Sequence, residues 1–134
     1  MAFKNIKIPE ENRKEYEVDG EIKKPRFCTI DEDKDVILFG CWMVYEEPQE
    51  EIFALVWKEK IVKAHLRYEI ENKNTTIWEL LAINIPKDIE FYREAIIADL
   101  REAMKVYGFD GDISCLCDGD EVYLNKNRKI IINF

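Results

Sequence analysis

The sequence PKDIEFYREAIIADLREAMKVYG, residues 86–108, decides the fold because it predicts one long amphipathic helix. Apolar residues recur there at steps of three and four, which 3.6 residues per turn places on one helix face. They are Ile89, Tyr92, Ile96, Leu100, Ala103 and Tyr107, widened by Ile97 and Met104. Pro86 suits the first turn, Asp88 can cap it or favour its dipole, and Gly108 is typical of a helix end. This apolar face must bury against a second element, and a sheet is the only candidate of sufficient size.

The residues before this helix predict an antiparallel meander. Residues 61–71 alternate with period two, the pattern of a strand with one dry and one wet face. The dry side carries Val62, Ala64, Leu66, Tyr68 and Ile70, and the wet side Lys63, His65, Arg67, Glu69 and Glu71. We expect flanking strands at 52–57 and 75–85, joined to this one by short polar turns.

Further upstream, residues 26–30 and 36–45 predict a strand pair with a polar turn at 31–35. Residues 36–45 and 52–57 are apolar on both faces, which indicates strands near the middle of the sheet. Gly40 suggests a bulge there. The acidic stretch at 46–51 reads as a loop, and residues 9–17 as a short surface helix.

After the long helix, short strands are expected at 113–117, 122–124 and 129–134, separated by turns. The sequence therefore predicts a single α+β domain over residues 1–134. Its sheet should be largely antiparallel, with about five to eight strands and one long amphipathic helix packed on one face.

The composition is that of a folded acidic protein. Of 134 residues, 47% are hydrophobic and 36% charged, and the formal net charge is −8. The N-terminal sequence lacks the apolar run of a signal peptide, and no apolar stretch reaches the roughly 20 residues of a membrane span, so we expect a cytoplasmic protein. The negative field disfavours nucleic acid and anionic membranes and suits a basic protein partner, although acidity can also serve solubility alone.

No residue pattern predicts a metal site or a cofactor. The cysteines are Cys28, Cys41, Cys115 and Cys117, and free thiols are the default without an export signal. The one-residue spacing of Cys115 and Cys117 is shorter than structural zinc pairs use. The Asp-Gly pairs at 110–111 and 118–119 predict turns rather than calcium loops.

No residue pattern predicts an active site either. His65, the only histidine, shares the wet strand face with Lys63 and Arg67 and reads as a solvated histidine rather than a general base. Phosphate loops, dinucleotide motifs and nucleophile elbows are absent from the sequence. We therefore expect no catalytic residues, and a protein that is not an enzyme.

Acidic residues concentrate in two of the predicted loops. If residues 26–30 and 36–45 pair, these loops lie at opposite ends of the 36–45 strand. A further acidic group, Asp110, Asp112, Asp118, Asp120 and Glu121, follows the long helix. Because concentrated loop acid steers association with a basic partner, the two loops are the predicted partner-binding site. Its residues are Asp31, Glu32, Asp33, Asp35, Glu46, Glu47, Glu50 and Glu51.

Three stretches give the chain a layout that resembles a known group of proteins. They are FKNIKIPEENRKEY at 3–16, RFCTIDEDKDVILFG at 26–40, and EIFALVWKEK running into IVKAHLRYEI at 51–70. The layout is similar to the immunity proteins of bacterial contact-dependent inhibition and related polymorphic toxin systems. Those proteins are small, cytoplasmic and often acidic, and they bind and block a cognate toxin domain. The resemblance implies an inhibitor that occludes the active site of a toxin, with a basic nuclease as the expected target.

Two other hypotheses stay open at this point. A small enzyme or ligand-binding domain could have a pocket between helix and sheet lined by Trp42, Trp57 and Trp78, although large aromatic residues on strands more often belong to the core. Alternatively, the last strand, 129–134, could form an exposed edge through which two copies pair as a homodimer.

Overall fold

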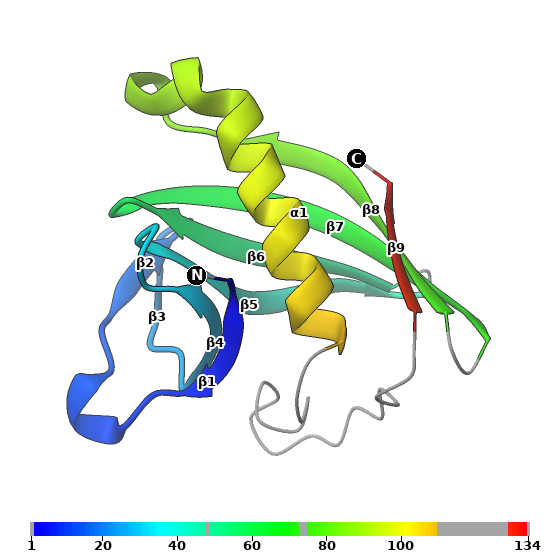
Figure 1. The fold of residues 1–134 in the computed structure, drawn as a ribbon, viewed down its shortest axis with the longest axis horizontal. Coiled ribbons are helices and arrows are strands. Elements are labelled where there is room, and N and C mark those ends of the chain that lie inside the picture. The colour runs from blue at the N-terminus through cyan, green and yellow to red at the C-terminus, as the bar shows by residue number, and fades with distance from the viewer. Residues whose placement is uncertain (1, 48, 73–74, 110–128, 134) are drawn as a thin grey trace.

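The computed structural model describes residues 2–47, 49–72, 75–109 and 129–133, and these form a curved sheet crossed on one face by a helix (Figure 1). The main sheet has seven strands in the order β1-β4-β5-β6-β7-β8-β9, and β2 and β3 form a separate hairpin. The strands of the main sheet are β1 (Lys4–Lys7), β4 (Phe27–Asp31), β5 (Val36–Glu46), β6 (Gln49–Trp57), β7 (Lys60–Asn72), β8 (Thr75–Asn84) and β9 (Lys129–Asn133). The hairpin consists of β2 (Tyr16–Val18) and β3 (Glu21–Lys23), and the helical elements are η1 (Glu10–Asn12), η2 (Lys87–Tyr92) and α1 (Arg93–Phe109).

Six strands of the main sheet pair antiparallel from β1 to β8, and β9 joins β8 in parallel. The α+β class and the largely antiparallel sheet are thus confirmed. So is the meander from β6 to β8, because each of its strands pairs with the next along the chain.

Most of the apolar stripe of the long helix buries against the sheet, as its periodicity predicted, but Tyr92 of the predicted stripe is 49% exposed. On the helix side the buried residues are Ile89, Ile96, Leu100, Ala103 and Met104. The sheet contributes Val36, Leu38, Phe53, Leu55, Trp57, Val62, Ala64, Leu66 and Trp78 to the same core. The alternation in β7 is confirmed, since Val62, Ala64 and Leu66 all lie in this core.

The ends of the helix differ from the prediction. Residues 87–92 form the 3-10 turn η2, and the α-helix begins only at Arg93. Pro86 is the N-cap residue and makes no side-chain cap, whereas Asp88 lies in the first turn, as its predicted role toward the dipole requires, and its carboxylate pairs with Lys60 of β7 at 2.8 Å. At the other end the helix continues through Gly108 to Phe109, so Gly108 does not terminate it.

A second core on the other face explains why β5 and β6 are apolar on both sides. Val18, Cys28, Phe39, Ala54 and Val56 are buried there, away from α1. The strands predicted at 36–45 and 52–57 are therefore central, as expected, and they occupy the third and fourth places in the sheet order. The predicted irregularity at Gly40 is also present, as a register shift between Gly40 and Trp42.

Two predicted segments are wrong. The short helix over 9–17 is only the single turn η1, and Tyr16 belongs to β2, where its ring packs on Phe39 with 5.3 Å between centroids. The loop over 46–51 is mostly strand: β5 runs through Glu46 and β6 begins at Gln49. The Cα partner of Glu46 is Gln49, so the acidic run forms a tight hairpin rather than a loop.

The predicted strands at 113–117 and 122–124, the Asp-Gly pairs at 110–111 and 118–119, the acidic group at 110–121 and Cys115 and Cys117 lie outside the described residues. The last predicted strand corresponds to β9, at one edge of the sheet. Within the described ranges, no helix has the length and apolar character needed to cross a membrane.

Candidate binding surface

The acidic turn between β4 and β5 is built around a buried carboxylate. Asp31 is only 1% exposed. Its Oδ1 accepts hydrogen bonds from the backbone N–H groups of Asp33, at 3.1 Å, and Lys34, at 3.2 Å. An aspartate that satisfies backbone donors two and three residues ahead fixes a turn. Unlike the other predicted residues of this turn, Asp31 is therefore not at the surface, and it holds the turn that carries its neighbours.

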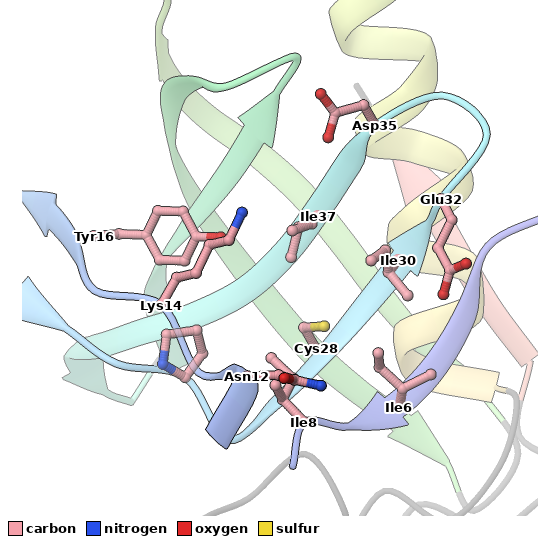
Figure 2. Close-up of a pocket in the computed structure, with 11 residues that line it drawn as sticks. Ile6, Ile8, Asn12, Lys14, Tyr16, Cys28, Ile30, Glu32, Asp35 and Ile37 are labelled. Atoms are coloured by element: carbon pink, nitrogen blue, oxygen red, sulfur yellow. The ribbon is translucent and has the colours of Figure 1, made fainter. Parts of the chain in front are cut away.

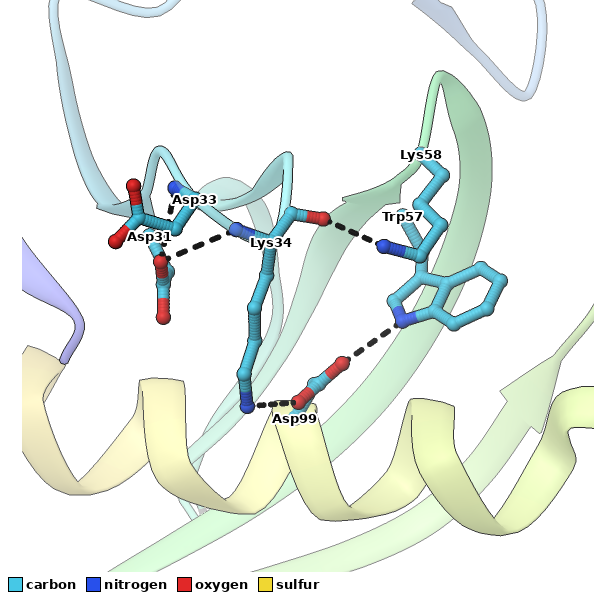
Figure 3. Close-up of polar contacts among 6 residues, drawn as sticks. All are labelled: Asp31, Asp33, Lys34, Trp57, Lys58 and Asp99. Atoms are coloured by element: carbon cyan, nitrogen blue, oxygen red, sulfur yellow. Dashed lines mark hydrogen bonds and ion pairs between the residues drawn. The ribbon is translucent and has the colours of Figure 1, made fainter. Parts of the chain in front are cut away.

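The side chain of Asp99 connects the same turn to the helix α1 and to Trp57 of β6 (Figure 3). Lys34 Nζ donates to Asp99 Oδ1 of α1 at 3.0 Å, and Trp57 Nε1 donates to Asp99 Oδ2 at 2.9 Å. The hydrogen bond to Asp99 raises the pKa of the Lys34 ammonium. Asp99 is 9% exposed, so both of its oxygens are used inside the fold.

The turn between β6 and β7 supplies two more hydrogen bonds. Lys58 Nζ donates to the backbone oxygen of Lys34 at 2.8 Å, and the backbone N–H of Lys58 donates to that of Asp35 at 2.9 Å. Helix, sheet and neighbouring turn thus hold residues 31–35 in one conformation. A binding element that is already ordered loses less entropy when a partner docks.

Three acidic side chains remain on the outside of this anchored turn: Glu32, Asp33 and Asp35 are exposed. Glu32 lies 3.7 Å from the ammonium of Lys4, and both of these side chains are well exposed to solvent. Lys34, whose side chain is half exposed, directs its ammonium to Asp99 of α1. The structure therefore brings three of the predicted residues together as one acidic surface.

An apolar hollow of about 290 Å³ lies beside this turn, on the sheet face away from α1 (Figure 2). Its apolar lining comes from the N-terminal segment, β4 and β5, and consists of Ile6, Ile8, Cys28, Ile30 and Ile37 with Pro25. Its polar lining consists of Asn12, Lys14, Tyr16, Glu32 and Asp35. The hollow is at the lower end of the volumes typical of small-molecule sites. Two acids of the turn, Glu32 and Asp35, thus border an apolar surface.

Two titratable groups of the hollow, the Cys28 thiol and the Tyr16 hydroxyl, have raised pKa values and are neutral at neutral pH. Burial raises the pKa of the Cys28 thiol to about 12, so it is protonated at neutral pH and acts as an apolar lining group. Burial also raises the pKa of Tyr16, with smaller contributions from Cys28 and the charge of Asp35. The arrangement of carboxylates around an apolar floor is suited to binding a cation that carries an apolar stem.

The second predicted acidic group lies at the far end of β5. This strand has 11 residues, so its ends are separated by roughly 30 Å at the usual rise of a strand. Glu46 and Glu47 are exposed there, next to the exposed apolar side chains of Met43, Val44 and Tyr45. The loops do lie at opposite ends of the strand, as expected, and consequently the eight predicted residues do not form one site.

Glu50 and Glu51 have roles in β6 that the sequence did not indicate. Glu50 Oε1 lies 2.7 Å from His65 Nε2, so the histidine, whose side chain is 27% exposed, is paired on its strand face rather than simply solvated. Glu51 is also partly buried, and burial raises the pKa of its carboxyl to about 7. These two acids belong to the sheet rather than to a loop surface.

The three tryptophans lie on two faces of the sheet. Trp57 and Trp78 are buried in the α1 core, whereas Trp42 packs on the opposite face, where the Lys23 ammonium lies 5.1 Å from its ring centroid. They therefore do not line a common pocket. In the described part of the chain, Cys28 and Cys41 are free thiols, and no three His, Cys, Asp or Glu side chains group as a metal site would require.

Sequence reasoning missed the hollow in part because it missed the β2–β3 hairpin, whose Tyr16 lines the hollow. The signal in the sequence is the dipeptide Asp19-Gly20. In the structure these two residues, with φ angles of 50° and 80°, form the turn that connects Val18 to its strand partner Glu21. Asp-Gly is the favoured pair for such a two-residue turn.

Comparisons of this chain with protein-family models, with curated proteins and with solved structures found no match.

Proposed function

We propose that this protein is an immunity-type inhibitor that binds a basic protein partner through the acidic turn at 31–35 and covers the active site of that partner. The observation that carries the proposal is the anchoring of the turn. Glu32, Asp33 and Asp35 are presented on a backbone held by Asp31, Asp99 and Lys58. Solubility alone would explain exposed acids, but it does not require them to be fixed in place.

The surroundings of the turn support a protein partner. Interfaces typically combine an apolar centre with a polar rim, and the hollow with its bordering carboxylates has this composition on a small scale. The formal net charge of −8 adds a long-range field that would speed encounter with a basic surface. Both features favour binding over catalysis as the role of this surface.

A toxin domain with nuclease activity is the partner class that best suits this chemistry. A nuclease must present cations to the phosphates of its substrate. An acidic turn that occupies those cations would compete directly with nucleic acid. Inhibition would then follow from occlusion of the substrate surface, without any reaction by the inhibitor.

The tip of the β5–β6 hairpin is a second candidate contact for the same partner. Tyr45 is 61% exposed there, and Met43 and Val44 lie beside it with Glu46 and Glu47. Exposed aromatic residues are frequent at the energetic centre of interfaces. Self-association through β9, at the sheet edge, stays a separate prediction that the molecular mass in solution would test.

The proposal predicts capture of a basic protein from the source organism by the tagged full chain. We expect a stoichiometric partner at low salt, with less retained at moderate salt, and toxicity of that partner when it is expressed alone. Co-expression with this protein should relieve the toxicity. The variant Glu32→Lys with Asp33→Lys should capture much less, because it reverses two exposed charges of the turn.

A matched variant controls for the overall change of charge. Glu90→Lys with Glu94→Lys makes the same substitution type at two exposed acids of η2 and α1, away from the turn. It should capture the partner almost as well as the unmodified protein. Failure to capture any basic protein at either salt concentration would overturn the proposed function.

A further inference from the structure

The hollow beside the acidic turn has the size and lining for one long side chain. Its volume of about 290 Å³ is small for a cofactor, and its floor is formed by isoleucines from three segments, among them Ile6, Ile30 and Ile37. A purely apolar occupant would leave Glu32 and Asp35 at the border without a new partner. An occupant with an aliphatic stem and a positive end would satisfy both parts of the lining.

The distribution of charge around the hollow indicates where the positive end would lie. Glu32 and Asp35 come from the turn, whereas Lys14 lies beside Tyr16, on the side away from Glu32 (Figure 2). Lys4 partly neutralises Glu32, but both side chains of that pair are exposed, and such pairs exchange partners at little cost. Asp35 and Tyr16 both line the hollow, so the carboxylate of Asp35 lies at its border.

We propose that the hollow receives a single lysine or arginine side chain of the partner, with the stem on the isoleucines and the cation between Glu32 and Asp35. This inference rests on the proposed function, because it names the group by which the partner is recognised. Charge complementarity and size support it. The turn that carries both carboxylates is fixed by Asp31 and Asp99, so the cation would meet acids already in position.

A small probe tests the hollow without knowledge of the partner. Amide spectra of the isotope-labelled full chain would be followed by NMR during titration with N-acetyl-lysine amide. We expect saturable shifts at Ile30, Glu32, Asp35 and Ile37. N-acetyl-norleucine amide, which has the stem without the charge, should bind more weakly by roughly three- to tenfold, the contribution of two exposed ion pairs.

Variants of the turn provide matched controls. Glu32→Gln with Asp35→Asn should weaken the lysine probe to the level of the norleucine probe. Asparagine suits position 35, where φ is 57°, because it tolerates left-handed backbone. Glu90→Gln with Glu94→Gln removes two negative charges from exposed acids of η2 and α1 that do not line the hollow, and it should leave the affinity for the lysine probe unchanged.

Filling the hollow provides a test that leaves the charges in place. Ile37→Trp should abolish the shifts, provided that its unfolding transition shows a folded protein. If this variant does not fold, the comparison of Glu32→Gln with Asp35→Asn against Glu90→Gln with Glu94→Gln still decides. The absence of saturable shifts, or equal binding of the lysine and norleucine probes, would overturn the proposal.

The outcomes separate this inference from the proposed function. If the protein captures a basic partner but its hollow does not bind the lysine probe, the inference is overturned and the proposed inhibitor role is unaffected. Saturable binding of the probe together with failure to capture any protein would support the hollow as a cation site and overturn the inhibitor role.

Discussion

Individual carboxylates in this acidic protein have very different environments. Asp31 and Asp99 are buried and hydrogen-bonded, Glu32 and Asp33 are exposed, and Glu51 is partly buried, which raises the pKa of its carboxyl. A count of acids in a loop does not distinguish these roles. The geometry of each side chain does, and it leaves fewer of the predicted residues together at an exposed turn than the sequence suggested.

Glu51 predicts a specific dependence of stability on pH. The pKa of its carboxyl is raised by burial from 4.5 to about 7 in the folded protein. Between these values the unfolded chain has lost the proton that the folded protein keeps. Its contribution therefore makes stability fall as pH rises from about 4.5 to about 7 and then stay level.

Replacing the group tests this sign. Glu51→Gln should be more stable than the unmodified protein at pH 8, by about 2 kcal/mol once partial exposure is allowed for, and no more stable at pH 4.5. Chemical denaturation at both pH values measures the difference. Glu47→Gln, at the exposed hairpin tip, should show no such gain. An equal gain for Glu51→Gln at both pH values would contradict the assignment.

At the scale of elements, one helix residue connects three parts of the fold. Asp99 of α1 accepts from Lys34 in the turn after β4 and from Trp57 at the end of β6. Asp99→Ala would leave the buried Trp57 N–H without its acceptor, a loss of about 1–3 kcal/mol in the free energy of unfolding. Asp99→Asn keeps one carbonyl acceptor and should lose less.

The same substitution tests whether the anchoring orders the turn. In Asp99→Ala, backbone amide exchange at Asp33, Lys34 and Lys58 should become faster than in Asp99→Asn, because the turn loses its connection to the helix. Hydrogen–deuterium exchange at single residues measures this. Unchanged protection at these amides would mean that Asp31 alone fixes the turn and that the contact with α1 does not help to order it.

Elements whose burial pattern is local could be predicted from the sequence. The helix stripe and the alternation of β7 are visible in neighbouring residues, because each element buries one face. The acidic strand ends at 46–51 were not visible, since Glu50 is accommodated by His65 of the next strand, 15 residues later. Strand propensity depends on such cross-strand partners, which a local reading does not include.

The N-terminal third was harder for a related reason. Pro9 and the glutamates after it favour a helix locally, but Tyr16 packs on Phe39 and belongs to a hairpin. Tertiary contact overrides weak helix propensity in such a segment. The hollow could not be predicted, because it exists only where this segment meets β4 and β5.

At the scale of the whole molecule, the sheet separates two cores and carries acid at both ends of its β5 strand. The α1 core and the core under the β2–β3 hairpin bury opposite faces of β5 and β6, which makes this strand pair the centre of the fold. The acidic turn lies at one end of β5 and the hairpin tip with Tyr45 at the other. A partner that reached both would span roughly 30 Å of this surface.

The measurement that tests the account most directly is the association rate constant of the captured partner, determined at several salt concentrations. Glu32→Lys with Asp33→Lys should lower this rate about tenfold or more at low salt and flatten its salt dependence, because steering depends on charge at the contact. Glu90→Lys with Glu94→Lys, the matched change on the helix side, should lower it much less. Equal losses for the two variants, or no loss for either, would contradict the assignment of the partner surface to the acidic turn.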